Sequence, residues 1–177
     1  MKKIFDLAFH HYQNGNLNQA EILFKKVLKS IPKHFSSIFL LGTLSAQDKK
    51  FQTAKKLLKQ AIEINPNYAE AHNNLGSVFQ ELGKHQEAIA SYQSAININP
   101  NILTTYHNLA NSLNILGKHQ EAIVSYQKVI EKNPNYIEAR NNLGNVFQVL
   151  GKYQEAIFCY KKVIQINSDY FKAYFNL

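Results

Sequence analysis

Asparagine recurs at one fixed interval along the chain. Asn74, Asn108, Asn142 and Asn176 are evenly spaced, and two of them stand in the repeated stretch NNLG. Asparagine is a weak helix former, because its short amide competes for the backbone's own hydrogen bonds. An amide offers one acceptor and two donors, which match the N–H and C=O of a peptide backbone. The spacing therefore predicts either a row of peptide-binding amides or a repeated polar residue that packs or is solvated.

The residues that usually catalyse or bind metals are not spaced for either task. Cys159 is the single cysteine, which excludes an internal disulfide and a CxxC site. His85 and His119 fill equivalent turn positions, and His10 and His11 would point about 100° apart on a helix. No HExxH, GxSxG, P-loop or GxGxxG motif occurs. We expect no catalysis, cofactor or metal in this chain, and Cys159 as a packing residue.

Several other residue types keep the same interval, which organises the whole chain. The members are Pro32, Pro66, Pro100 and Pro134, and Ala20, Ala54, Ala88, Ala122 and Ala156. Gly15, Gly83, Gly117 and Gly151 follow it as well, with Lys49 in the missing place. A fixed period between about 20 and 50 residues is typical of a solenoid built from stacked repeats.

Each repeat has the pattern of two helices, as residues 69–102 illustrate. Apolar residues at Ala71, Leu75, Val78, Phe79 and Leu82 follow the spacing of one helical face. Gly83 indicates a turn, a second apolar stripe follows, and Asn-Pro at 99–100 ends it. Small residues at Gly42, Gly76 and Gly144 are expected to let helix backbones approach, since glycine within a helix costs about 1 kcal/mol relative to alanine.

A period of about 34 residues with these residue types resembles the tetratricopeptide repeat. The resemblance rests on Leu75, Gly76, Phe79, Ala88, Tyr92, Ala95 and Pro100 and their equivalents. It implies an all-α fold, a right-handed superhelical solenoid of helix–turn–helix units in a single domain spanning 1–177. The repeats are 1–34, 35–68, 69–102, 103–136 and 137–170, and 171–177 is a partial repeat or short cap. The family's usual Trp is replaced by His72, Tyr106, Arg140 and Tyr174.

The family layout places the first helix of each repeat on the inside, where it lines a groove. The groove residues that this implies are Asn73, Asn74, Ser77, Asn108, Asn111, Asn141, Asn142, Asn145, Lys172 and Asn176. The row of amides and the amino-acid sequence of the third to fifth repeats resemble the superhelical repeat arm of O-linked N-acetylglucosamine transferase. Asn111, Asn142 and Lys172 also match a carboxylate clamp of some family members, but His107 and Asn176 replace two of its cations. We therefore expect no working clamp.

The first two repeats depart from the row of amides. Asp6 and Leu40 hold the place of the recurring asparagine there. The same face offers Phe5, Phe9 and Phe39, with Lys2 nearby. This mixture predicts either an apolar pocket or weaker packing at the end of the solenoid.

The positive charge of the chain is concentrated at its start. Residues 1–60 contain eleven Lys and three acidic residues, a net charge of +8, whereas residues 61–177 are neutral overall. A basic strip is predicted on second helices, consisting of Lys25, Lys26, Lys29, Lys55, Lys56 and Lys59. It is either a solvated face or a surface for nucleic acid, an acidic partner or a membrane surface, although no aromatic residue is interleaved for base stacking.

The ends of the chain carry two further expectations. The start lacks the pattern of a signal peptide, and no apolar run is long enough to span a membrane, so we expect a cytoplasmic protein. The chain stops in DYFKAYFNL, halfway through the first helix of a sixth repeat. We expect a longer parent protein, a short capping helix, or a homodimer in which Tyr174 and Leu177 are covered.

The sequence thus favours a non-catalytic scaffold that binds a protein or extended peptide. The alternative, which the resemblance implies, is the substrate-recruiting arm of a larger enzyme, a glycosyltransferase. A weaker alternative is nucleic-acid binding through the N-terminal lysines.

Overall fold

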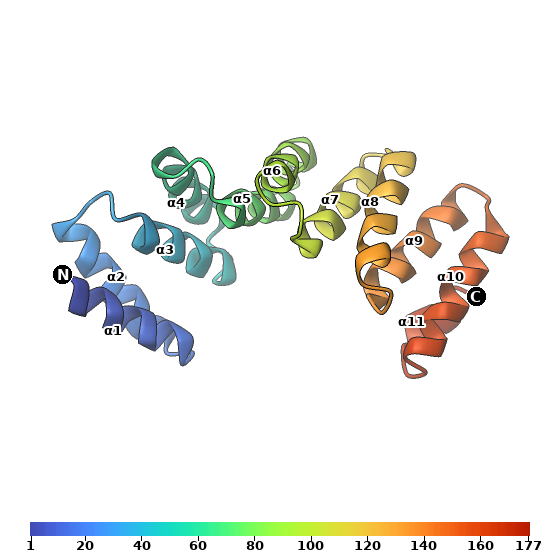
Figure 1. Cartoon of the computed structure of the whole chain (residues 1–177), viewed down its shortest axis with the longest axis horizontal. Coiled ribbons are helices and arrows are strands. Elements are labelled where there is room, and N and C mark those ends of the chain that lie inside the picture. Colours follow the sequence, from blue (N-terminus) through green and yellow to red (C-terminus); the bar gives the residue numbers. More distant parts are fainter. The chain divides into compact units, whose positions relative to one another are not determined.

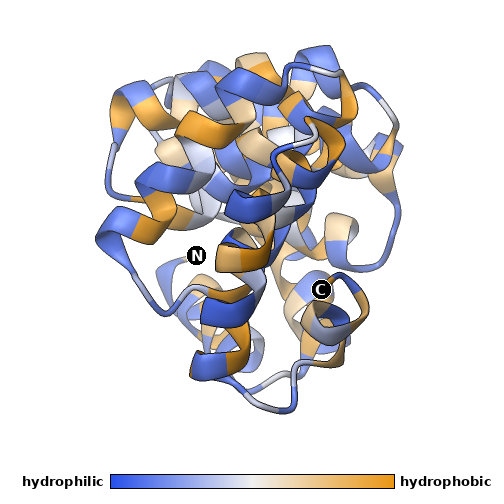
Figure 2. Ribbon diagram, turned by 90° about the vertical axis from the view of Figure 1, so that its right-hand side faces the viewer, coloured by the Kyte–Doolittle hydropathy of each residue, from blue (hydrophilic) through white to orange (hydrophobic).

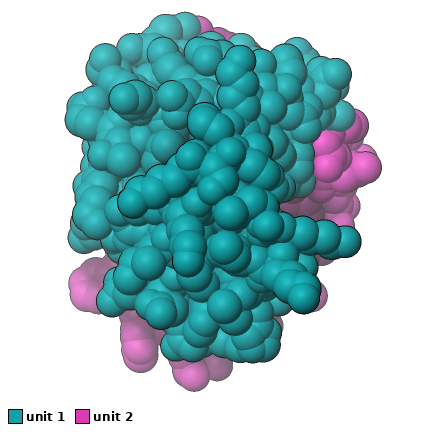
Figure 3. Space-filling view, turned by 90° about the vertical axis from the view of Figure 1, so that its left-hand side faces the viewer, with its two compact units in different colours: residues 1–98 teal, residues 99–177 magenta.

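The computed structural model describes residues 1–177, and every regular element in it is an α-helix (Figure 1). The chain divides into two compact units, unit 1 (1–98) and unit 2 (99–177), which Figure 3 colours separately. That the repeats form one continuous domain stays a prediction. None of the helices has both the length and the apolar composition needed to cross a membrane.

Unit 1 consists of three helix pairs. They are α1 (Lys2–Gln13) with α2 (Leu17–Ser30), α3 (Phe35–Gln47) with α4 (Phe51–Ile64), and α5 (Ala69–Glu81) with α6 (His85–Ile98). Unit 2 contains two pairs and a short last helix. They are α7 (Leu103–Ile115) with α8 (His119–Lys132), α9 (Ile137–Val149) with α10 (Tyr153–Ile166), and α11 (Phe171–Phe175). The predicted helix–turn–helix pattern is confirmed.

The turn inside each pair depends on one residue in a left-handed conformation. Gly83 has a φ of 71°, and the turn is closed by bonds from Gly83 N to Gln80 O and from Lys84 N to Phe79 O. This is the arrangement in which glycine ends a helix most easily. Lys49 takes the same conformation with a φ of 58°, although it carries a side chain. The sequence had placed Lys49 in the glycine position, and the structure shows that the turn is kept there despite the strain.

In most connections between pairs, the turn is fixed by an asparagine that precedes the recurring proline, although Ile31 holds this place in the first. In unit 1, Asn65 Oδ1 accepts a hydrogen bond from the backbone N of Asn67 at 3.3 Å. In unit 2, the same turn forms at Asn133, and also at Asn167, where Ser168 replaces the proline. An asparagine side chain that bonds to the backbone two residues on mimics a backbone turn. The side chain thus keeps the turn even where the proline is missing.

The core of each unit lies between the paired helices. In the helices that face the viewer in Figure 2, hydrophobic residues alternate with hydrophilic ones. The recurring alanines of the second helices are buried, namely Ala20, Ala54, Ala88, Ala122 and Ala156. Larger buried side chains of the second helices pack beside them, including Phe24, Tyr92 and Tyr160.

The glycines within first helices make room for an aromatic ring. A Cβ added to Gly76 would lie 2.5 Å from Cε1 of Tyr92, and one added to Gly144 would lie 2.5 Å from Cε1 of Tyr160. The expectation that these glycines bring backbones together is thus corrected, because the group that comes close is a buried tyrosine of the paired helix. At Gly42 the nearest atom is the Leu58 side chain, at 3.0 Å.

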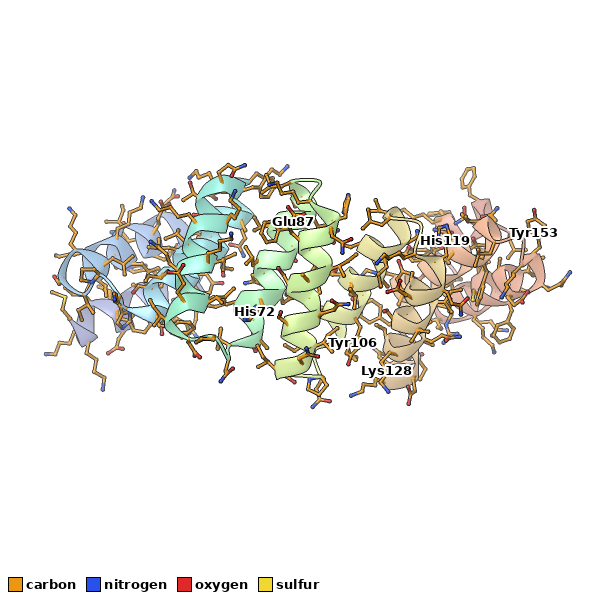
Figure 4. All side chains as sticks on the ribbon, turned by 90° about the horizontal axis from the view of Figure 1, so that it is seen from above. His72, Glu87, Tyr106, His119, Lys128 and Tyr153 are labelled. Carbon is orange, nitrogen blue, oxygen red and sulfur yellow. The ribbon has the colours of Figure 1, made fainter.

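Two of the residues that replace the family's Trp bond to the preceding connection. His72, labelled in Figure 4, donates from Nε2 to the carbonyl oxygen of Pro66 at 2.9 Å. Arg140 donates from Nη2 to the carbonyl oxygen of Pro134 at 2.9 Å. A polar side chain at this position therefore fastens the first helix to the turn before it.

We predict that Gly144→Ala destabilises the protein by about 1–3 kcal/mol, the usual cost of overpacking a core. Helix propensity alone predicts the opposite sign, a gain of about 1 kcal/mol. Urea unfolding of the variant and the wild type distinguishes the two. A midpoint equal to or above that of the wild type would show that the Tyr160 ring does not require the glycine.

Candidate functional site: a polar face on the first helices

We call the polar face the polar side chains of the first helices that line two hollows, at equivalent positions of successive repeats. In unit 1, Thr43, Gln47, Asn74 and Ser77 line a hollow of about 450 Å³ between α3 and α5. In unit 2, Asn142, Asn145, Lys172 and Asn176 line a hollow of about 470 Å³ between α9 and α11. These two hollows lie where the sequence predicted groove residues.

The recurring asparagines bond from one repeat to the preceding one. Asn74 Nδ2 donates to Thr43 Oγ1 at 3.1 Å in unit 1. In unit 2, Asn142 Nδ2 donates to Asn111 Oδ1 and Asn176 Nδ2 donates to Asn145 Oδ1, each at 3.1 Å. The three acceptors occupy the same place of their repeats. The amides therefore hold neighbouring first helices in register, which explains their recurrence on packing grounds.

Each acceptor on the polar face of unit 2 also receives a buried tyrosine hydroxyl. Tyr126 donates to Asn111 Oδ1 at 2.5 Å, and Tyr160 donates to Asn145 Oδ1 at 2.8 Å and to Gln148 Oε1 at 3.2 Å. A buried hydroxyl without a partner would be costly, and an amide oxygen has two lone pairs to offer. One amide thus joins its own helix pair to the next repeat.

Tyr92 plays the same part in unit 1, with a hydroxyl acceptor in place of the amide. Its hydroxyl donates to Ser77 Oγ at 3.2 Å and to Gln80 Oε1 at 3.1 Å. Burial raises the pKa of Tyr92 to about 12, and a hydrogen bond with Ser77 acts in the opposite direction. The hydroxyl therefore stays protonated and remains a donor at physiological pH.

The recurring asparagines keep binding capacity beyond these bonds. Asn142 directs its amide nitrogen toward Asn111 Oδ1, and the same nitrogen lies 3.3 Å from His107 Nε2. Asn176 uses one hydrogen toward Asn145. Both are only partly buried. Packing and ligand binding are therefore compatible functions of the same amide, since each bond occupies only part of it.

The remaining predicted groove residues differ in accessibility. Asn73 donates to Asn74 Oδ1 at 3.3 Å, and Asn108 is partly buried on α7. Asn141 is 3% exposed, so little more than its edge reaches the hollow that it lines. It is thus a packing residue first, and sequence reasoning could not distinguish it from Asn142 beside it.

His107 stands in unit 2 where the carboxylate clamp would have a lysine. Its ring lies 5.3 Å from the Tyr136 ring and 6.0 Å from the Tyr126 ring. Burial lowers the pKa of His107, while a hydrogen bond with Asn108 and the charge of Glu138 act in the opposite direction. The imidazole is therefore neutral, and Nε2 accepts from Asn142.

The aromatic residues predicted in unit 1 form a real hollow. Phe5, Phe9 and Phe39 line it as the sequence suggested, and it has a volume of about 250 Å³. Phe35 and Tyr68 complete its walls. Sequence reasoning missed these two, although both stand at the junction of repeats. Of the two interpretations of this region, the apolar pocket is the one that the structure supports.

The predicted basic strip has mixed surroundings. Lys25 pairs with Glu21 at 2.5 Å, and Lys59 Nζ lies 5.9 Å from the centre of the Phe79 ring. Lys26, Lys29 and Lys56 are exposed, and Lys55 is half-buried. Exposed ion pairs of this kind contribute little to stability. Whether the strip binds a partner stays a prediction.

Of the remaining residues that the sequence indicated, Cys159 is buried, whereas Tyr174 and Leu177 are exposed. Cys159 is 4% exposed, and burial raises the pKa of its thiol to about 11, which suits a packing residue and not a nucleophile. No three side chains of His, Cys, Asp or Glu gather as a metal site would require. At the last helix, Tyr174 and Leu177 are each 52% exposed, which leaves the predicted dimer contact accessible.

We predict that Asn142 and Asn111 are energetically coupled. Asn142→Ala, Asn111→Ala and the double variant should give a coupling energy of about 0.5–1.5 kcal/mol in a double-mutant cycle of urea unfolding, the usual net value of a hydrogen bond. The control cycle pairs Asn142→Ala with Lys161→Ala, whose side chain is exposed on α10. Additive effects in both cycles would mean that the amides do not join the repeats.

We predict that His107 makes the protein less stable in mild acid. Its pKa in the folded state is lowered, so the unfolded chain takes up the proton first as the pH falls below its ordinary value of 6.5. Stability is then complete above pH 6.5 and declines below it. The loss in free energy of unfolding between pH 7.5 and pH 5.5 should be smaller in His107→Gln than in the wild type. An identical loss in both would exclude His107 as its source.

Comparisons with known proteins agree with this architecture. A family model described as "Tetratricopeptide repeat" matches residues 67–132, and a second of that description matches residues 137–170. A model of "Anaphase-promoting complex, cyclosome, subunit 3" matches residues 13–95. A search of the curated proteins found no match.

Among solved structures, the crystal structure of MamA is 27% identical, with 93% of this chain and 96% of that chain covered and a TM-score of 0.86. YrrB, described as "a TPR protein with an unusual peptide-binding site", is 20% identical, with coverage of 97% and 89% and a TM-score of 0.87. MamA 41-end from Desulfovibrio magneticus RS-1 is 16% identical, with coverage of 96% of both chains and a TM-score of 0.88. At these lower identities, the similarity to YrrB and to MamA 41-end shows a shared fold alone.

The two tetratricopeptide models together match more than half of the chain, and they fall on helix pairs that the structure contains. The even period of the sequence, the glycine turns and the buried tyrosines are thus explained together. The chain belongs to the tetratricopeptide repeat family.

Proposed function

We propose that the chain is a non-catalytic scaffold that binds a protein or an extended peptide along the polar face of its first helices. The proposal rests on the recurring asparagines, whose amide groups are only partly engaged in hydrogen bonds between repeats. Asn176 uses one amide hydrogen on the preceding repeat, and Asn142 uses both of its hydrogens there, on Asn111 and His107. The remaining amide groups of Asn142 and Asn176 are presented at one hollow. A peptide backbone supplies the complementary donors and acceptors at every residue.

The comparisons support the same role. YrrB shares the fold and is described as having a peptide-binding site. The polar face itself consists of amides, hydroxyls and a lysine, which suit binding more than bond cleavage. Because such a face contacts backbone groups, it would accept segments of varied sequence.

The predicted alternative was the arm of a larger glycosyltransferase. It rests on the resemblance of the row of asparagines and of the sequence of the third to fifth repeats. None of the three family models and three structures named above is described as a glycosyltransferase. Binding of nucleic acid through the lysines, a homodimer at the last helix and a cytoplasmic location likewise stay predictions.

The proposal predicts that the amides of the polar face contribute to peptide affinity. Dodecapeptides selected by the wild type from an immobilised random array would be measured by fluorescence anisotropy. Asn142→Ala combined with Asn176→Ala should weaken binding by about tenfold, which corresponds to two ordinary hydrogen bonds. Gln93→Ala combined with Lys161→Ala, on exposed positions of second helices, is the matched control and should change nothing.

Peptides methylated on alternate backbone nitrogens test the mode of binding directly. They lose the N–H donors that the amide oxygens would accept, so affinity should fall although the side chains are unchanged. Equal affinity of methylated and unmethylated peptides, or of the amide variant and the wild type, would refute backbone recognition. Circular dichroism confirms that each variant is folded at the temperature of measurement.

A further inference from the structure

Unit 1 contains an apolar counterpart of the polar face. We call the aromatic cleft the hollow of about 250 Å³ that is lined by Phe5, Phe9, Phe35, Phe39 and Tyr68, together with Ser36 and Leu40. These residues come from α1, from α3 and from the residue before α5, which are three successive first helices (Figure 1). Partly exposed aromatic side chains gathered around a hollow are typical of binding sites.

The walls of the aromatic cleft are fixed by contacts among the rings. Phe5 and Phe9 stack with their centres 6.2 Å apart, and Phe35 and Phe39 do the same at 6.2 Å. Tyr68 meets Phe35 and Phe39 edge-on, at 5.0 Å in each case. Edge-to-face and offset-stacked pairs are the favourable arrangements of aromatic rings. The cleft is therefore formed before any ligand arrives.

The phenylalanines of α1 and α3 in the cleft include residues at repeat positions that carry asparagine in later repeats. Phe5 and Phe39 occupy the place of Asn73 and Asn141, and Phe9 occupies that of Asn145. The face that offers amides in later repeats thus offers rings in the first two. The side chain of an incoming segment, and not its backbone, is what an aromatic wall can recognise.

The size of the cleft restricts what enters. Pockets for drug-sized ligands measure roughly 300–1,000 Å³. A hollow of about 250 Å³ lies below that range, so it suits one large side chain better than a packed helix. Phe9 is 38% exposed and so remains available to such a group.

The charge of the residues that neighbour the cleft in the sequence favours an acidic segment. Lys2, Lys3 and Lys33 are exposed near its rings in the chain, against Asp6 and Glu70. The surplus is larger over the whole region, because residues 1–60 carry a net charge of +8. A field of this sign attracts carboxylates and repels lysine-rich segments.

We propose that the aromatic cleft anchors one phenylalanine side chain of an extended acidic peptide. This rests on the proposed function and adds a side-chain preference to it. The peptide would be held by its backbone where the face offers amides and identified by its anchor residue at the cleft.

The test uses three fluorescein-labelled nonapeptides with the full-length chain. The first has a central phenylalanine among alternating serine and glutamate, the second has alanine at the centre, and the third has lysine in place of each glutamate. In anisotropy titrations the first should bind about tenfold more tightly than the alanine peptide, since burying an aromatic side chain contributes on this scale. It should also bind more tightly than the lysine peptide, because the positive charge of this region attracts glutamate and repels lysine.

Two variants locate the effect. Phe9→Ser should remove the preference for phenylalanine over alanine. Leu7→Ser, which replaces an exposed apolar residue of α1 outside the cleft, should leave the preference intact. Circular dichroism verifies that both remain helical. A preference that survives Phe9→Ser would overturn the assignment to the cleft, and Phe39→Ala repeats the test from the facing helix.

The outcomes separate this proposal from the function proposed above. Equal binding of the phenylalanine and alanine peptides overturns the anchor and leaves backbone binding standing. Binding of the lysine peptide as tight as that of the glutamate peptide overturns the acidic partner. If no peptide of the three binds, the anchor is overturned, and the random array decides by itself whether the polar face binds peptides.

Discussion

The third to fifth repeats depend on a buried tyrosine that lies between the two helices of each pair. In the third and fifth repeats its ring takes the space left by a glycine, 2.5 Å from where a Cβ would stand. The ring is removed from water, but the hydroxyl must find an acceptor. The acceptor is always a side chain on the polar face, Ser77, Asn111 or Asn145. The requirement of one buried group thus decides what stands on the face that would meet a ligand.

The recurring asparagine follows from this constraint. The amide that satisfies the tyrosine has a lone pair left, and the asparagine of the next repeat donates to it. Core packing, contact between repeats and the binding face are consequently joined through one amide oxygen. A change made to any of the three would therefore affect the other two.

Much of the fold was predictable because it depends on local signals that repeat. Glycine turns, prolines and apolar spacing each predict the same helix boundaries, and α3, α5, α7 and α9 begin at the first residues of the predicted repeats. The role of Gly76 was not predictable, since a sequence does not show that a ring from the paired helix fills the space. The sequence also could not show that Asn141 is buried and Asn142 more exposed. The two residues are identical and adjacent, and only the packing of the helix decides which side chain points inward. The aromatic cleft was seen in part, because Phe35 and Tyr68 join it only through the packing of successive repeats.

The bond between Asn142 and Asn111 has a mechanical consequence. It spans two successive first helices of unit 2, and it uses a hydrogen that a bound segment could also claim. A ligand that took both amide hydrogens would have to break this bond, and the two repeats would then be freer to move apart. The same amide hydrogens thus serve ligand binding and the contact between the two repeats of unit 2. A ligand that binds through both hydrogens therefore also weakens the contact between these repeats.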